Sequence, residues 1–351
     1  MKIVFVVSAL HGGGAERVVA TLASRCAQSG DEVTILMTAG DACVYPLHER
    51  VKVLSIGQQS HGNPLVQLGR LFRLRRYFKM HPDSRIVSFS TSINLFTIVA
   101  SLGLKNRVIV SERNDPNQCR YKVLRNRIYR FGRGFVFQTK EARAHFPASI
   151  QRKGIVIPNP LRKGLPAVYT GVREKKIAAA GRLEPQKNHR LLLEAFAGFH
   201  KKYPEYTLHL FGEGRLEGPL REKAVMLQIE NYVIFEGFRS DILETIRTYD
   251  MYVLSSDYEG ISNSLMEAMA LGLPCVATDC PIGGSALCIR HGRNGLLVPA
   301  GNRAALQAAM EKLAGDRAVS ARVGKHAAKI RERFAEEKIA DRWRSYIDGE
   351  N

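Results

Sequence analysis

The chain has 351 residues, a length typical of two domains, and its 45% hydrophobic and 24% charged residues exclude a largely disordered protein. The most apolar stretch, residues 93–104, is far shorter than the roughly 20 apolar residues of a membrane-spanning helix, so we expect no membrane span. The net charge of +19 is concentrated in residues 1–160, which hold 24 Lys and Arg against 9 Asp and Glu. Such a basic field attracts nucleic acid, an anionic membrane or a polyphosphate, and charge alone does not choose among them.

The chain opens with a predicted β-strand at residues 2–7, followed by three glycines and by a stretch of helical apolar spacing at residues 15–27. The short apolar run resembles a weak signal peptide, but no small-residue cleavage pattern follows it, so we expect a cytoplasmic protein. With a next strand at residues 32–36, the order strand, helix, strand predicts a parallel α/β sheet. Further strands are predicted at residues 85–89, 108–110 and 134–137, with helices between them.

The middle of the chain has the composition of a domain linker. An apolar strand at residues 155–157 runs into two prolines, and a polar stretch continues to about residue 175. A second α/β series then begins, with a helix from about residue 188 and strands at residues 176–180, 207–211, 232–235, 251–254 and 274–278. The sequence therefore predicts an α/β protein of two doubly wound domains. In such sheets ligands bind at the carboxyl ends of the strands.

The loop and helix start at residues 254–268 could bind an anion. Ser262, Asn263 and Ser264 are good N-cap residues, so the backbone N–H groups and the helix dipole would point out of this loop. Glu259 and Glu267 could bracket hydroxyl groups on either side of a phosphate. The same pattern also fits a capped surface helix with solvated glutamates.

A second candidate loop follows the strand at residues 176–180. It carries Arg182 and Lys187, two fixed cations that could neutralise a diphosphate. Solvated loop charges are the alternative for this segment taken alone.

Together these motifs resemble the family 4 glycosyltransferases of the GT-B fold. The resemblance implies two Rossmann-like domains that face a central cleft. It assigns residues 1–160 to the acceptor side and residues 161–330 to the nucleotide sugar, with residues 331–351 as a helix that crosses back to the first domain. The matching residues are Gly12-Gly13-Gly14-Ala15-Glu16-Arg17, Gly181-Arg182 with Lys187-Asn188, Gly212-Glu213-Gly214, Glu259 with Glu267, and Asn294-Gly295-Leu296-Leu297-Val298.

The resemblance also implies an activity: a retaining transfer of a hexose or N-acetylhexosamine from a nucleotide sugar, most often UDP-linked. By the family pattern, Arg182 and Lys187 hold the donor diphosphate, Glu267 binds the ribose, and Glu259 contacts the transferred sugar. These implied roles make Glu259, Arg182 and Lys187 the candidate catalytic residues. The other expected donor contacts are Gly14, Gly181, Phe238, Arg239, Gly260, Ile261, Ser262, Asn263, Ser264 and Glu267.

Neither a metal nor a cofactor is expected. Fixed cations and amide dipoles can stabilise the leaving nucleoside diphosphate, and the chain has no Asp-x-Asp motif of the kind that metal-dependent glycosyltransferases use. The six cysteines are scattered without a C-x-x-C pair, which favours neither a zinc site nor a disulfide framework. In the family the leaving phosphate is thought to accept the proton of the acceptor hydroxyl.

Two basic amphipathic segments indicate where the acceptor could bind. Residues 65–79 carry Arg70, Arg73, Arg76 and Lys79 at steps of three, which we expect to form a slanting row on one side of a helix, and residues 120–133 form a second basic segment. Both segments also fit ordinary solvated helices.

The acceptor prediction rests on a further likeness, to bacterial transferases that add N-acetylgalactosamine to undecaprenyl-diphosphate-linked oligosaccharide. There a helix in the same place holds the acceptor diphosphate. The likeness implies a lipid-linked oligosaccharide acceptor, an anionic membrane surface as partner, and a peripheral position on the inner face of the plasma membrane. The corresponding residues in this chain are Arg70, Arg75, Arg76 and Lys79.

The segment after the strand at residues 108–110 departs from the family pattern. Many relatives carry a histidine near the donor sugar after the strand at residues 108–110, whereas this chain has Glu112 and Arg113. Either Arg113 replaces the histidine or its role is absent, and both residues are candidates for the acceptor side.

Other classes of function were weighed against this one. A nucleic-acid-binding protein would need stacking aromatic residues among the cations or a recognition helix, and the sequence indicates neither, so no nucleic acid partner is expected. A dehydrogenase is disfavoured because the G-x-G-x-x-G fingerprint fails at Arg17. A lipopolysaccharide core glycosyltransferase, and a sugar phosphorylase or epimerase of the same fold, remain as alternatives to a role in surface polysaccharide or glycoprotein glycan assembly.

Overall fold

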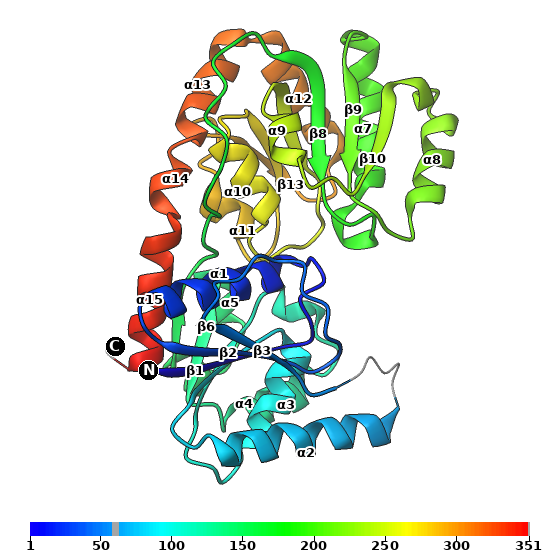
Figure 1. Ribbon diagram of the computed structural model, residues 1–351. Coiled ribbons are helices and arrows are strands. Elements are labelled where there is room, and N and C mark those ends of the chain that lie inside the picture. The colour runs from blue at the N-terminus through cyan, green and yellow to red at the C-terminus, as the bar shows by residue number, and fades with distance from the viewer. Residues whose placement is uncertain (58–62, 350–351) are drawn as a thin grey trace. The chain divides into compact units, whose positions relative to one another are not determined.

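The computed structural model describes residues 1–57 and 63–349. The chain divides into two compact units, one of Met1–Pro160 with Glu336–Asn351 and one of Leu161–Ala335. Each unit is built around a parallel sheet with helices on both faces (Figure 1). Among the described helices, none combines the length and the apolar character that crossing a bilayer requires.

The first unit holds a seven-stranded sheet in the order β3-β2-β1-β4-β5-β6-β7. Every neighbouring pair is parallel, as expected where helices connect the strands. The strands are β1 (Lys2–Val7), β2 (Glu32–Met37), β3 (Val51–Ser55), β4 (Arg85–Phe89), β5 (Arg107–Ser111), β6 (Gly134–Phe137) and β7 (Gly154–Val156).

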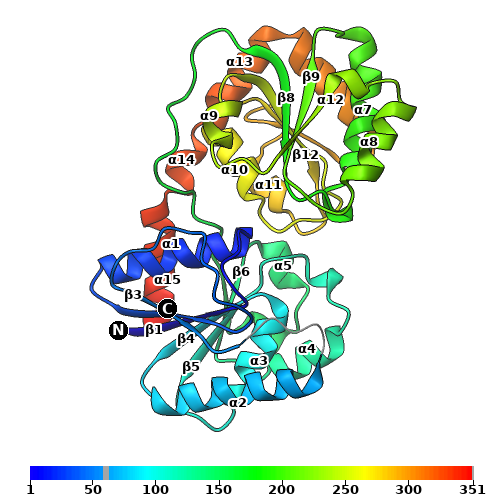
Figure 2. The same cartoon turned by 45° about the vertical axis from the view of Figure 1, so that its right-hand side comes forward.

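Helices cover this sheet on two faces, and the alternation of side chains along β1 shows how. Phe5 packs in the core cluster under one face together with Trp343, whereas Val4 and Val6 pack in the cluster under the other face. Figure 2 shows α1 and α15 over the first face and α2, α3 and α4 over the second. The helices are α1 (Gly14–Gln28), α2 (Pro64–Met80), α3 (Thr91–Ser101), α4 (Lys122–Tyr129), α5 (Lys140–Ala144), α6 (Ala148–Gln151) and α15 (Glu336–Asp348), with a short 3-10 helix η1 (Pro116–Gln118).

The second unit holds a six-stranded parallel sheet in the order β10-β9-β8-β11-β12-β13. The chain leaves β8 toward β9 on one side and later returns to β11 on the other, so the direction of winding reverses between β8 and β11. The strands are β8 (Glu174–Ala180), β9 (Thr207–Phe211), β10 (Val233–Gly237), β11 (Tyr249–Leu254), β12 (Cys275–Asp279) and β13 (Leu296–Pro299).

Two buried clusters again separate the faces of this sheet. Ile177 and Ala179 of β8 pack with α7, α8 and α12, whereas Ala178 and Ala180 pack with α9, α10 and α14. The helices are α7 (His189–Lys202), α8 (Glu217–Met226), α9 (Ile242–Ile246), α10 (Asn263–Ala270), α11 (Gly284–Cys288), α12 (Arg303–Gly315), α13 (Arg317–Ala327) and α14 (Ile330–Arg333), with 3-10 helices η2 (Pro185–Lys187) and η3 (Glu230–Tyr232).

The predicted fold class, α/β with two Rossmann-like sheets, is confirmed. Two strands went unpredicted: β3, whose residues after Val51 are exposed, and β13, which has only four residues. The second unit ends at Ala335 rather than at residue 330, because Ile330 and Phe334 are buried in its core. The segment that belongs to the first unit is therefore α15.

Candidate active site

The strongest candidate site lies at the carboxyl ends of β8 and β11, where the winding of the second sheet reverses. Ligands of doubly wound sheets bind at such a switch point because the loops on its two sides diverge. The loop after β8 contains Arg182 and Lys187, and the loop after β11 contains Glu259. The predicted catalytic residues therefore follow two adjacent strands.

Hydrogen bonds between the two loops hold them together. The Asp257 N–H donates to the Gln186 carbonyl at 3.0 Å, and the Gln186 side-chain amide donates to the Tyr258 carbonyl at 3.1 Å and to Glu259 Oε2 at 2.9 Å. Asn188 adds a hydrogen bond from Nδ2 to Asp257 Oδ1 at 2.7 Å. The two loops form one continuous wall.

Lys187 and Glu259 form an ion pair in this wall. Lys187 Nζ lies 2.8 Å from Glu259 Oε1, and the two side chains are only 13% and 11% exposed. The Ser255 hydroxyl donates to the Lys187 carbonyl at 2.9 Å, which fixes the backbone that carries the cation. A cation and a carboxylate are thus held together with little access of water. Among the described residues, the Arg182 guanidinium of the same loop has no ion-pair partner, and the residue is exposed.

The start of α10 adjoins this wall. Ser262 is its N-cap, and its hydroxyl accepts a hydrogen bond from the Leu265 N–H at 3.4 Å. The Ser264 hydroxyl donates to the Ala180 carbonyl at 3.2 Å and accepts from the Tyr252 hydroxyl at 2.8 Å, so it ties the helix start to the end of β8. The first turn of α10 therefore opens beside the end of β8.

Close backbone packing joins further loops to this edge. A Cβ at Gly284, the first residue of α11, would lie 1.7 Å from the Gly260 carbonyl oxygen, and a Cβ at Gly212, after β9, would lie 2.2 Å from the Gly181 carbonyl oxygen. Only glycine permits such an approach. The predicted donor residues Gly181, Gly260 and Ile261 lie in these packed loops.

The remaining predicted donor residues lie around this edge. Glu267 is buried on α10, and Arg162 Nε lies 4.0 Å from its Oε1 atom. Phe238 is 74% exposed just after β10, two strands from β8. Arg239 is held by Asp241 at 2.6 Å and Glu236 at 3.3 Å.

The glycine loop of the first unit has a different arrangement. The N–H groups of Gly12 and Gly13 donate to Glu16 Oε2 at 3.0 and 3.1 Å, and Gly14 begins α1. The carboxylate of Glu16 therefore occupies two of the amides that an anion at this loop would use.

Glu112 lies inside the first unit rather than at its surface. It accepts hydrogen bonds from the Tyr129 hydroxyl, from Thr91 Oγ1 at 2.9 Å and from Asn94 Nδ2 at 3.3 Å. Burial raises the pKa of Glu112, although these hydrogen bonds and Arg125 oppose the shift. The network joins α3, β5 and α4.

Arg113 also packs within the first unit. Its guanidinium lies 4.8 Å from the Phe89 ring and 5.2 Å from the Trp343 ring, and Nη1 donates to Asn159 Oδ1 at 2.8 Å. Burial lowers the pKa of Arg113 to about 9, with a partial offset from Glu112. The Arg113 side chain therefore connects the loop after β5 to Asn159, three residues after β7, and to Trp343 of α15.

The predicted row of cations on α2 is wrong in its geometry. Arg70 is buried and donates to Gln67 Oε1 at 3.2 Å, and Arg75 donates to the Ala100 and Leu102 carbonyls at 3.0 and 2.7 Å. Steps of three residues turn back by about 60° each on a helix of 3.6 residues per turn, so Arg70 and Lys79 lie on opposite sides. The exposed cations of α2 are Arg73, Arg76 and Lys79.

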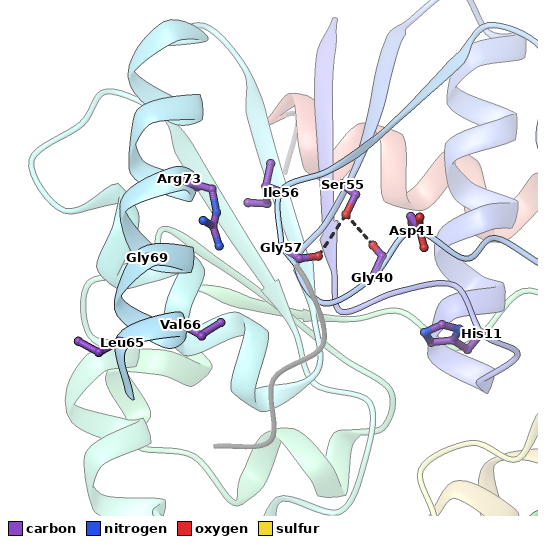
Figure 3. A pocket seen from close by; sticks show the side chains of 10 residues that line it. All are labelled: His11, Gly40, Asp41, Ser55, Ile56, Gly57, Leu65, Val66, Gly69 and Arg73. Atoms are coloured by element: carbon purple, nitrogen blue, oxygen red, sulfur yellow. Dashed lines mark hydrogen bonds between the residues drawn. The ribbon is translucent and has the colours of Figure 1, made fainter. Parts of the chain in front are cut away.

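A pocket of about 890 Å³ lies beside α2 in the first unit. Loops after β1, β2 and β3 line one side and the first half of α2 lines the other, with the Arg73 side chain extending toward the Ile56–Gly57 side (Figure 3). Its other lining residues are His11, Gly40, Asp41, Ser55, Ile56, Gly57, Leu65, Val66 and Gly69. Its strand side carries the polar side chains of His11, Asp41 and Ser55, and its helix side carries Leu65 and Val66 together with Arg73.

Sequence reasoning missed several residues of these sites. Gln186 and Asp257 were not singled out, although both are polar residues in loops that follow adjacent strands. Arg162 lies in the linker, and its proximity to Glu267 depends on how the linker folds back. Asp41 of the pocket follows the second strand of the first sheet, a position that the rule of strand ends could have indicated.

Comparison with known proteins agrees with this arrangement. The family model "Glycosyltransferase Family 4" matches residues 12–162, and "Glycosyl transferases group 1" matches residues 174–316, so each unit is matched by one of the two models. The chain is a family 4 glycosyltransferase. The predictions of the GT-B fold and of a glycosyltransferase are confirmed.

Three relatives of this glycosyltransferase illustrate the likeness. An uncharacterized glycosyltransferase of Haemophilus influenzae is 23% identical over 98% of both chains. A Campylobacter jejuni enzyme named as a GalNAc-alpha-(1->4)-GalNAc-alpha-(1->3)-diNAcBac-PP-undecaprenol alpha-1,4-N-acetyl-D-galactosaminyltransferase is 26% identical over 90% of this chain and 89% of that one. The crystal structure of Anabaena HepE in complex with UDP-glucose aligns with a TM-score of 0.82 at 19% identity over 99% of each chain.

Proposed function

We propose that this glycosyltransferase moves a sugar, with retention of anomeric configuration, from a UDP-linked donor to a glycan carried on a polyprenyl diphosphate at an anionic membrane surface. The observation that carries the donor half is the ion pair of Lys187 and Glu259 at the switch point of the second sheet. HepE, which shares the fold, is described in complex with UDP-glucose, and this supports a UDP-linked donor.

The Lys187–Glu259 pair suits a site that must bind a diphosphate and a sugar together. When a diphosphate arrives, the Lys187 ammonium can turn to the phosphate oxygens, and Glu259 is released to accept hydrogen bonds from sugar hydroxyls. The exchange keeps both charges satisfied in a region with little water, where an unpaired charge would be unfavourable. Arg182, exposed in the same loop, adds a second cation, and Glu267 would accept the ribose hydroxyls.

These groups act on the bond between the anomeric carbon and the phosphate oxygen. As this bond breaks, negative charge grows on the leaving diphosphate, and Lys187, Arg182 and the amides at the start of α10 stabilise it. The acceptor hydroxyl attacks the same face of the sugar, and its proton passes to the leaving phosphate.

Two observations support a lipid-diphosphate acceptor. The Campylobacter jejuni relative is named for an undecaprenyl-diphosphate substrate. In addition, α2 presents Arg73, Arg76 and Lys79 to solvent next to apolar side chains, with Leu65 77% and Phe72 63% exposed. Cations can hold the diphosphate while the apolar side chains enter the lipid interface.

The pocket beside α2 is the proposed place for the glycan of the acceptor. Its volume of about 890 Å³ falls in the usual range of small-molecule sites, and Asp41, His11 and Ser55 offer hydrogen-bonding groups for sugar hydroxyls. Arg73 lines the same pocket, so the glycan would lie next to the cations of α2.

A transfer assay tests this function. Purified protein is incubated with a panel of UDP-sugars and a polyprenyl-diphosphate-linked oligosaccharide in detergent, and the product mass is read by mass spectrometry. We expect one sugar donor to add a hexose or N-acetylhexosamine. Hydrolysis of the UDP-sugar, or phosphorolysis of an oligosaccharide, without any transfer to the lipid acceptor would contradict the proposal.

Lys187→Met is the matched test of the donor site. Loss of this cation should lower kcat/KM about 100-fold or more, since removing one stabilising group at a developing charge typically has an effect of this size. Lys202→Met, which removes an exposed lysine paired with Glu311 at the far end of α7, should leave turnover within about twofold.

A further inference from the structure

His189 is a buried histidine at the first position of α7, two residues after Lys187. It is 5% exposed, and in the described part of the chain neither ring nitrogen makes a well-aligned hydrogen bond, although the Gly181 and Arg182 carbonyls lie within reach of the ring. Buried polar side-chain atoms are normally bonded, so such a ring needs an explanation. The backbone carbonyls of Gly181 and Arg182 lie beside the ring and favour its protonated form.

The surroundings keep this ring neutral in the absence of a ligand. Burial, and then the charge of Lys187, lower the pKa of His189 to about 4, and the two carbonyls oppose this shift. The other charged groups of these loops are Arg182 and Glu184 on the same loop, with Glu184 paired with Arg215 at 2.8 Å, and, from the loop after β11, Asp257 and Glu259. Asp257 is bonded to Asn188, and Glu259 is paired with Lys187.

A nucleoside diphosphate next to Lys187 would reverse the electrostatic field at this ring. A unit negative charge about 6 Å away, at an effective dielectric constant of about 20, raises the pKa of a histidine by about 2. The two charges of a diphosphate and the neutralisation of Lys187 act in the same direction, so both raise the pKa of the ring toward the range where it binds a proton at neutral pH. A doubly protonated ring offers two donors, one for each carbonyl, whereas a neutral ring offers one.

We propose that His189 is a positioning residue for the donor: it takes up a proton from solvent when a nucleoside diphosphate occupies the loop after β8, and then donates hydrogen bonds to the Gly181 and Arg182 carbonyls. These bonds fix the backbone that carries Arg182 beside the phosphates. The inference rests on the donor site proposed above and adds a residue and a proton to it.

The test measures binding of UDP-glucose between pH 6 and pH 8. Both phosphates of this ligand are esterified and do not titrate in that range. Calorimetry in two buffers of different ionisation enthalpy gives the number of protons taken up. For the wild type we expect uptake of about 0.5 to 1 proton near pH 7, with affinity rising about 10- to 100-fold from pH 8 to pH 6 by linkage.

The variants separate positioning from a structural role. His189→Asn should abolish the proton uptake and reduce the change in affinity to less than about twofold. The matched control is His200→Asn, which changes another buried histidine of the same helix and should retain the full pH response. NMR of the His189 ring in the wild type, with and without UDP-glucose, gives the same answer without a variant: its pKa should rise on binding.

The outcomes distinguish this inference from the donor site itself. Binding without proton uptake, uptake that persists in His189→Asn, or an unchanged His189 ring on NMR would overturn the role of His189 alone. Absence of saturable binding of both UDP and UDP-glucose at every pH would overturn the proposed donor site and, with it, this inference.

Discussion

At the scale of single residues, the proposed donor site depends on Lys187 and Glu259, which would give up their mutual contact for a diphosphate and a sugar. Lys187 and Glu259 satisfy each other 2.8 Å apart in a region that excludes most water, and Gln186 holds the second carboxylate oxygen at 2.9 Å. If the proposed function is right, a donor separates this ion pair when it binds. This competition has a consequence that can be measured with single substitutions.

Glu259→Gln should separate binding from turnover. Without the carboxylate, Lys187 is free for the diphosphate, so UDP affinity should rise about threefold to tenfold, whereas turnover should fall about 100-fold because the sugar loses its acceptor of hydrogen bonds. Calorimetry with UDP and an assay with the donor measure the two effects. Equal losses of affinity and turnover would show that Glu259 does not compete for Lys187.

Glu112 predicts a dependence of stability on pH. Its folded-state pKa is raised by burial, so between the unfolded value and this raised value the native state binds more protons than the unfolded state. The free energy of unfolding should therefore fall as pH rises through that window and be highest below it. Urea unfolding at a series of pH values measures the slope.

Glu112→Gln should remove this slope, since glutamine does not titrate. Its unfolding free energy near pH 7 should equal or exceed that of the wild type, because no charge is buried. The control is Glu141→Gln, which changes an exposed glutamate of α5 and should preserve the slope. A slope that survives in Glu112→Gln would contradict the assignment.

At the scale of elements, α2 shows how helical geometry sorts a run of like charges. The cations of α2 divide between a buried side, where Arg75 bonds the last carbonyls of α3, and an exposed side with Arg76 and Lys79. Leu65, Leu68 and Phe72 lie on the exposed side as well, at 77%, 49% and 63% exposure. A helix that exposes both classes of side chain is suited to a lipid interface.

Binding to vesicles tests this face of α2. With vesicles of 30% phosphatidylglycerol, Phe72→Ser combined with Arg76→Gln should weaken binding about tenfold or more, through lost insertion and lost charge attraction. The control is Met226→Ser with Arg221→Gln, an equally exposed apolar and basic pair on α8 of the second unit. Equal binding of both double variants would show that α2 does not contact lipid.

At the scale of the whole chain, α15 makes the first unit discontinuous in sequence. Ile339, Trp343 and Ile347 are buried in the cluster under α1, and the Trp343 ring stacks on Phe89 at 5.5 Å between centroids. Tyr346 accepts a hydrogen bond from the Phe135 N–H at 2.9 Å and donates to the Lys153 carbonyl at 2.6 Å. The last residues of the chain therefore complete the core that the first 160 residues begin.

Substitution within α15 should destabilise this core. Ile339→Ala should lower the free energy of unfolding by about 2–5 kcal/mol, through lost burial and a cavity. Trp343 is the single tryptophan of the chain, so its fluorescence reports the unfolding of the first unit. Asp341→Ala, at an exposed position of the same helix, should change the midpoint little; a similar loss in both variants would contradict the packing role.

The extent of successful prediction differed between the fold and the site. Runs such as residues 3–7 and 134–137 are buried in a parallel sheet covered on both faces, so their continuous apolar character identified them as strands. The edge strand β3 was not predicted because its side chains after Val51 are exposed and do not form a continuous apolar run. For the proposed donor site, the sequence indicated Arg182, Lys187 and Glu259 through loops that follow strands and through the family resemblance, and their roles stay a prediction.

The sequence by itself determined the alternation of strands and helices, the two sheets and the loops that carry the candidate donor residues. These follow from local periodicity and from the position of polar residues at strand ends. Only the tertiary structure decided that Gln186 and Asp257 join the two loops, that Glu112 and Arg70 are buried, and that α15 belongs to the first unit. Such features depend on contacts between residues far apart in the chain, and local sequence patterns carry no record of those contacts.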